Sequence, residues 1–119
     1  MRTVLPTRRR SVTREVEYSG MPFTVTVGYD KAGAPKEVFA DGVHNGSAMA
    51  VIISDACVLV SVALQHGITP PELGKSLGRV PCGSFLGVTS DRAASPLGVI
   101  VEVASTPLAD VVSDIQEAI

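Results

Sequence analysis

The side chains that could carry chemistry in this chain are two histidines, two cysteines and a run of arginines. His44, Cys57, His66 and Cys82 are spread too far apart for a zinc site, whose ligands come in closely spaced pairs. No nucleophile stands next to a candidate base, as covalent catalysis would require. His66 falls near the end of an apolar segment, where a cation is favoured by the helix dipole. We therefore expect no metal, no cofactor, no disulfide and no catalytic activity of the chain on its own.

One segment comes close to a phosphate-binding loop. Residues 69–76 read TPPELGKS, but Thr69 stands where the first glycine of a P-loop belongs. A phosphate cradle also needs free backbone N–H groups, and Pro70 and Pro71 remove two of them. Thr69 followed by two prolines and Glu72 is instead typical of a capped helix start.

The arginines are concentrated at the N-terminus. Half of the ten basic residues lie in the first fourteen positions, and no acidic residue precedes Glu15. Arg8, Arg9 and Arg10 could bind phosphates or a partner protein. The net charge of −2 and the 4% aromatic content make nucleic acid the less favoured partner. Because Pro6 interrupts any helix and no apolar face is visible, we expect residues 1–12 to form an extended arm that reaches beyond the domain body.

The rest of the chain, residues 13–119, has the size of one domain. Apolar residues make up 45% of the sequence, whereas charged residues make up only 18%, below the quarter that is usual for a soluble domain. This low charge content predicts that another chain covers part of the surface. The start lacks the apolar core of a signal peptide and no cysteine pair is closely spaced, so we expect a cytoplasmic location.

The first half of this domain predicts an antiparallel hairpin sheet. Residues 12–18 alternate imperfectly and end at a Ser19-Gly20 turn, and residues 23–29 alternate clearly between apolar and polar side chains. A loop at residues 30–35 then leads to a return strand at residues 36–40.

The stretch at residues 48–66 is too long for a strand and predicts a buried central helix. Ser54, Ser61 and Gln65 fall on one stripe of this helix, bordered by Asp55 and His66. The polar stripe and Asp55 count against a membrane span. It is either a close helix-packing seam or the face that meets solvent. We favour the seam, because small residues let two backbones approach.

The second half predicts helices. A short helix opens at Thr69 and ends at Gly78, and residues 79–91 read as a loop. Ser95-Pro96 and Thr106-Pro107 each look like a helix cap followed by proline, although residues 97–103 fit a helix or a strand equally well. The predicted fold class is α+β: an antiparallel sheet of about three strands, followed by helices packed on one face, with a central buried apolar helix.

Several segments together resemble one family, the TSCPD-type domain found at the C-terminus of cobalamin-dependent ribonucleotide reductases and also alone. The resemblance is strongest in SVALQHGI at residues 61–68, and the EVF at residues 37–39 matches the family's hairpin. The LPTRR start at residues 5–9 is similar to the segment that precedes this domain in the reductases. The likeness extends over residues 23–42, 46–68, 70–78 and 94–103.

The family's signature itself is degenerate in this sequence. Thr-Ser-Cys-Pro-Asp would fall at residues 94–98, where only Ser95 survives, and Pro96 and Gly98 replace the cysteine and the aspartate. The resemblance therefore implies a stand-alone, non-catalytic accessory or regulatory protein linked to deoxyribonucleotide synthesis, with a ribonucleotide reductase subunit as a partner. The alternatives are a small-ligand or nucleotide-binding protein, or a nucleic-acid-binding module that uses the arginine arm.

The apolar helix also predicts a homo-oligomer. Its apolar residues spread over most of its circumference, whereas a small sheet can cover only one side of a helix. A twofold dimer is the commonest closed assembly, so we expect a homodimer in which residues 48–65 form the contact or lie beside it.

Overall fold

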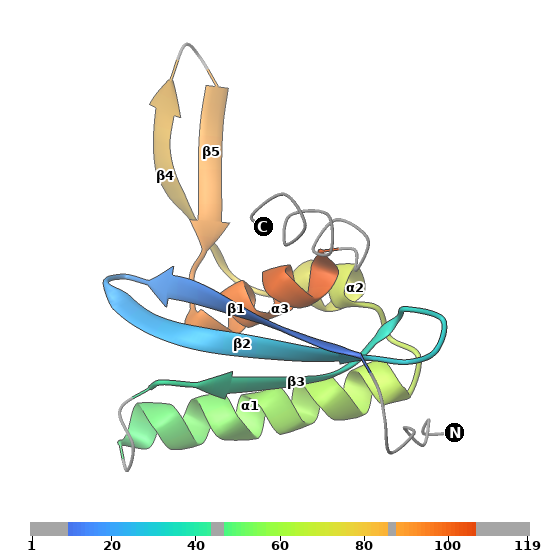
Figure 1. Cartoon of the computed structure of the whole chain (residues 1–119). Helices are drawn as coiled ribbons and strands as arrows, with labels where there is room; N and C mark the ends of the chain where they lie inside the picture. Colours follow the sequence, from blue (N-terminus) through green and yellow to red (C-terminus); the bar gives the residue numbers. More distant parts are fainter. Residues whose placement is uncertain (1–9, 44–46, 86–87, 107–119) are drawn as a thin grey trace, which may run out of the picture.

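The computed structural model describes residues 10–43, 47–85 and 88–106, with side chains described outside residues 82–90. Its centre is a three-stranded antiparallel sheet in the order β1-β2-β3 (Figure 1). The strands are β1 (Ser11–Tyr18), β2 (Met21–Tyr29) and β3 (Pro35–Asp41). The predicted strands and the α+β class are confirmed. The N-terminal arm is shorter than expected, because Ser11 and Val12 already pair with β2.

The two hairpin turns follow from their residues. Ser19 and Gly20 both have positive φ, 51° and 84°, so Tyr18 and Met21 pair directly across a two-residue turn. In the second turn, the Asp30 carboxylate accepts hydrogen bonds from the backbone N–H groups of Ala32 and Ala34, both at 2.9 Å. The turn chemistry that the sequence predicts thus fixes the register of the sheet.

Alternation divides the sheet into an apolar and a polar face. Phe23, Val25 and Val27 on β2 are buried, together with Val38 opposite Val27 on β3. The intervening residues point the other way, and the hydroxyls of Thr13 and Thr26 lie 2.8 Å apart across the strands. The polar face carries no described helix.

The described residues form three helices. α1 (Ala48–Gln65) begins at Ser47, whose side chain accepts from the Ala50 N–H. α2 (Pro70–Gly74) is capped by Thr69, and α3 (Pro96–Ser105) is capped by Ser95. Residues 97–103, which fit a helix or a strand equally well by sequence, are therefore helical. α2 ends at Gly74, four residues before the predicted end. The helix predicted from Thr106-Pro107 onwards falls mostly outside the described residues.

A second antiparallel pair replaces the loop predicted at residues 79–91, and that prediction is wrong. β4 (Arg79–Phe85) and β5 (Val88–Ala93) form a hairpin that projects from the body (Figure 1). Its base is held by Arg79, which forms ion pairs with Asp91 on β5 and Glu102 on α3. This hairpin was not predicted because Pro81 and the polar residues of β5 break the apolar–polar alternation that is typical of strands. A register shift also follows Pro81.

α3 and α1 share one hydrophobic core with the apolar face of the sheet. Ile100 of α3 is completely buried, and the Tyr18 hydroxyl donates to the Ala94 carbonyl just before α3, at 2.8 Å. α1 contributes a narrow inner stripe of buried apolar residues: Ile53, Cys57, Val60 and Leu64.

The expectation that α1 is buried on all sides is wrong for a single chain. Leu59 is 72% exposed and Ile52 is 63% exposed, because α1 forms an outer layer beside β3 (Figure 1). By length and composition this helix could also cross a membrane. In the folded domain, however, its inner stripe belongs to the core of the sheet.

The polar stripe of α1 faces the open edge of β3. Ser61 Oγ accepts from the Val38 N–H at 2.9 Å, and the Ser61 hydroxyl donates to the Val38 carbonyl at 3.3 Å. One turn later, Gln65 Nε2 donates to the Lys36 carbonyl at 3.1 Å. The Lys36 ammonium in turn donates to the Leu64 carbonyl at 3.2 Å, near the negative end of the helix dipole. The stripe is therefore a seam between helix and strand, and not between two helices.

This arrangement predicts unequal effects of two similar substitutions. Ser61→Ala removes both hydrogen bonds to Val38 and should lower the free energy of unfolding by about 1–3 kcal/mol. Ser54→Ala, on the same stripe but exposed, should change it by less than about 0.5 kcal/mol. Urea denaturation of the two variants measures the difference. Equal losses would mean that Ser61 does not stabilise the edge of β3.

Candidate docking surface

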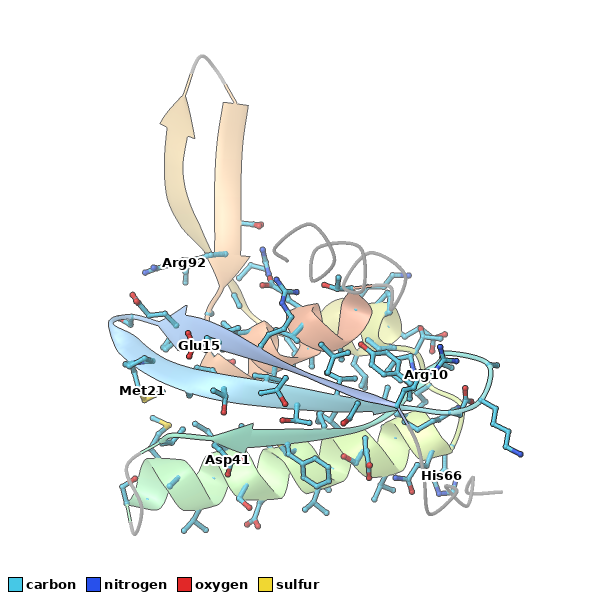
Figure 2. All side chains as sticks on the ribbon, in the orientation of Figure 1. Arg10, Glu15, Met21, Asp41, His66 and Arg92 are labelled. Carbon is cyan, nitrogen blue, oxygen red and sulfur yellow. The ribbon has the colours of Figure 1, made fainter. Side chains whose placement is uncertain are left out.

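Most of the exposed large apolar side chains of the described residues lie on α1, where they form its outer face. Four residues of this helix are each more than half exposed: Val51, Ile52, Val58 and Leu59. Met49 is 46% exposed. Large apolar patches are rare on the surface of a monomer and usually mark an interaction site. The same face carries Asp55 and ends at the exposed His66, which caps α1 (Figure 2).

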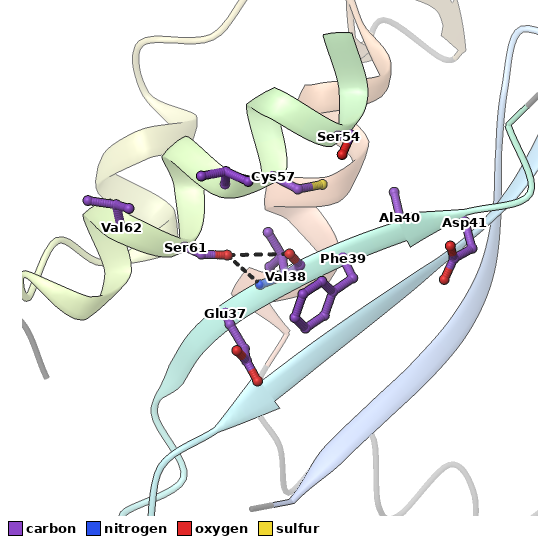
Figure 3. A pocket seen from close by; sticks show the side chains of 10 residues that line it. Glu37, Val38, Phe39, Ala40, Asp41, Ser54, Cys57, Ser61 and Val62 are labelled. Carbon is purple, nitrogen blue, oxygen red and sulfur yellow. Dashed lines mark hydrogen bonds between the residues drawn. The ribbon is translucent and has the colours of Figure 1, made fainter. Parts of the chain in front are cut away.

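A hollow of about 480 Å³ lies between β3 and α1, next to this face. Figure 3 shows Glu37, Phe39 and Asp41 along its strand wall and Ser54, Ser61 and Val62 along its helix wall. The remaining lining residues are Val38, Ala40, Cys57 and Val58.

The backbone of β3 is only partly covered at this hollow. Val38 bonds outward to Ser61, and in an antiparallel pair such outward residues alternate with residues that bond to the neighbouring strand. Ala40, two residues on, therefore also directs its N–H and C=O groups outward. The hollow thus offers one backbone donor and one acceptor beside two carboxylates.

The charges in the hollow disfavour phosphate ligands. Its described lining holds Glu37 and Asp41 but no lysine or arginine. A second hollow, at the β1–β2 end of the polar face, holds Glu15 and Glu17 and likewise no cation among its lining residues. Both hollows are therefore better suited to a cation or a hydrogen-bond donor than to a nucleotide phosphate.

Cys57 lies at the floor of the first hollow but is a poor nucleophile. Burial, reinforced by the nearby charge of Asp41, raises the pKa of this thiol to about 11. The thiolate is the reactive form, so very little of it exists near neutral pH. The side chain acts as a small apolar group of the core.

The residues singled out in the sequence do not converge on one site. Ser61 and Gln65 bind the backbone of β3, Ser54 lines the hollow, and His66 is exposed. Arg10 is exposed at the start of β1, whereas Arg8, Arg9 and His44 lie outside the described residues, as does the side chain of Cys82. Within the described part of the chain, no three His, Cys, Asp or Glu side chains are grouped as a metal site requires.

Neither the hollow nor its two carboxylates, Glu37 and Asp41, was predicted from the sequence. The alternation of β3 does place both on the polar face with Phe39 between them, and an exposed phenylalanine on a polar face was the available signal.

Comparison with known families gives one match. A family model described as the TSCPD domain matches residues 2–113, nearly the whole chain. The chain belongs to the TSCPD domain family. No curated protein and no solved structure gives a significant match.

The segment that resembles the TSCPD signature forms the start of α3. Ser95 caps α3 by accepting from the Gly98 N–H at 3.2 Å, and Pro96 occupies the first helical position. A Cβ atom at Gly98 would lie 2.7 Å from the Ala93 Cβ, too close for any side chain without movement of β5. This segment therefore works as a helix start, and Pro96 in it is buried.

The raised pKa of Cys57 predicts slow alkylation. At pH 8 about one thiol in a thousand is ionised when the pKa is near 11, so Cys57 in a Cys82→Ser background should react with iodoacetamide far more slowly than free cysteine. Asp41→Asn should lower this pKa, because it removes a negative charge that disfavours the thiolate. Mass spectrometry of the alkylated chain against pH gives both values. Reaction as fast as that of free cysteine would show that the thiol is accessible and ionised.

Proposed function

We propose that this TSCPD domain is a non-catalytic accessory protein of deoxyribonucleotide synthesis, and that it works by docking. The observation that carries the proposal is the exposed apolar face of α1. The family is known from ribonucleotide reductases, which makes a reductase subunit the expected partner. The unreactive environment of Cys57 and the lost signature cysteine support a role beside the reductase chemistry.

We also propose that the docking unit is a homodimer formed through α1. Ala48, Ile52, Asp55, Leu59 and Val62 follow one another at alternating intervals of four and three residues, the spacing with which two helices pack side by side.

An antiparallel twofold pair suits the charges on this face. Asp55 and His66 lie eleven residues apart, with Leu59 and Val62 between them. When two copies of α1 cross midway between these positions, Asp55 of each copy faces His66 of the other, and the two pairs of apolar residues meet at the centre. A twofold interface has this reciprocal form.

Nucleotide binding receives less support. The two described hollows are lined by carboxylates and by no described cation. A ligand present at 100 times its dissociation constant adds about 2.7 kcal/mol to stability, which a thermal shift detects readily. We expect nucleoside di- and triphosphates to cause no such shift.

The dimer predicts a specific effect of charge on α1. Leu59→Arg places a charge at the centre of the apolar face and should give a monomer, with little loss of fold because Leu59 is exposed. Ser76→Arg, at another exposed position, is the matched control and should remain a dimer. Light scattering after size exclusion measures the mass. A mass near 12.4 kDa for the unmodified chain would refute self-association through α1.

The accessory role needs a separate measurement. The purified chain is titrated against the cobalamin-dependent ribonucleoside-diphosphate reductase of the same organism, and both binding and the rate of deoxynucleotide formation are followed. We expect saturable binding that Leu59→Arg weakens more than Ser76→Arg does. Absence of binding together with an unchanged reductase rate would contradict the role, whatever the oligomeric state.

A further inference from the structure

We propose that the hollow between β3 and α1 binds the arginine-rich arm of the same chain, residues 1–9. This inference goes beyond the accessory role and does not depend on it. It assigns an occupant to a groove that no described segment fills, and it gives the N-terminal arginines a binding site within their own domain.

The strand wall of the groove suits a guanidinium group. Glu37, Phe39 and Asp41 occupy alternate positions of β3, so their side chains lie on the same face of the sheet (Figure 3). Phe39 is 49% exposed between the two carboxylates, although it is a large apolar residue on a polar face. An arginine can pair with a carboxylate through two parallel hydrogen bonds and can also stack on an aromatic ring.

The helix wall provides apolar contact for the rest of the arm. Val58 and Val62 line the groove on its helix side, and Val58 is 58% exposed. The arm contains Val4, Leu5 and Pro6 in addition to its arginines. A groove with carboxylates on one wall and valines on the other therefore matches both kinds of side chain in the arm.

The polar face of the sheet carries a further carboxylate in line with Asp41. Glu15 on β1 lies opposite Thr24, which lies opposite Asp41 on β3, so Glu15 and Asp41 share one row of the polar face. The arm has the opposite charge, because residues 1–10 hold four arginines and no acidic residue. Complementary charge of this kind favours the bound state and selects against acidic competitors.

The arm starts close to the groove. The Tyr29 N–H donates to the Arg10 carbonyl at 2.9 Å, and the next residue, Ser11, lies opposite Gly28, which lies opposite Glu37. The arm thus leaves the sheet at the Glu37 end of β3, whereas Asp41 lies at the other end (Figure 2).

The arm is also long enough to follow the groove. Four residues of a strand cover about 13 Å, which is the length from Glu37 to Asp41. Nine extended residues reach at most about 30 Å, enough to turn back and run the length of the groove. Because the arm is tethered, its local concentration at the groove is of millimolar order, which favours the arm of the same chain over that of a second copy.

Limited trypsin digestion of the intact chain tests this proposal, because trypsin cleaves after arginine. If the arm is bound, trypsin should cut the unmodified chain slowly after Arg8 and Arg9. Asp41→Lys should release the arm and raise this cleavage rate at least about fivefold, because the rate of proteolysis follows the population of chains whose arm is unbound. Glu72→Lys, an equal charge change at an exposed position of α2, is the matched control and should leave the rate unchanged. Cleavage after the exposed Lys31, followed in the same digests by mass spectrometry, reports whether each variant is folded.

Three results would overturn the proposal. Equal rates after Arg8 and Arg9 in the unmodified chain and in Asp41→Lys would show that the groove does not hold the arm. A rate that falls as protein concentration rises would show that the arm binds a second copy. In 0.5 M salt the attraction between exposed charges is screened beyond about 4 Å. If the arm stayed protected from trypsin in this salt, the carboxylates of the groove would not be what holds the arm.

Discussion

The fold depends on how the last strand of its sheet is covered. An open strand edge presents unpaired N–H and C=O groups and is a site for unwanted pairing with other chains. Here α1 runs along β3 and satisfies part of that edge with side chains, since Ser61 binds both backbone groups of Val38 and Gln65 binds the Lys36 carbonyl. A helix can replace a neighbouring strand only where it carries polar side chains at this spacing, and this requirement explains a serine stripe on an otherwise apolar helix.

The same requirement decides which face of α1 is left outside. Ser61 and Gln65 must face the edge, and the core stripe with Cys57 and Leu64 must face the sheet, so the remaining apolar residues have no partner within the described part of the chain. The apolar surface is thus a geometric result of covering the edge. Beyond Val38 no described hydrogen bond joins α1 to β3, and the groove continues along this part of the strand past Phe39 to Asp41.

Much of this architecture could be read from the sequence. The alternation in β2, the Ser19-Gly20 turn and the Thr69 and Ser95 caps are local signals, and the structure has each of them. The polar stripe was recognised too, but its partner is a strand separated from it by more than twenty residues, and no local pattern names such a partner. The hairpin after Arg79 was missed because Pro81 disturbs its alternation.

The projecting β4–β5 ribbon has a consequence for how the domain opens. A two-stranded hairpin on its own is only marginally stable in water. This hairpin projects from the body (Figure 1), to which the ion pairs of Arg79 and the short link into α3 join it. Its amide protons can therefore exchange with solvent through local separation of two strands, while those of β2, between two neighbours, exchange only when the whole sheet comes apart. The described part of the chain thereby contains two levels of rigidity, and the ribbon that projects from the body is the less rigid part (Figure 1).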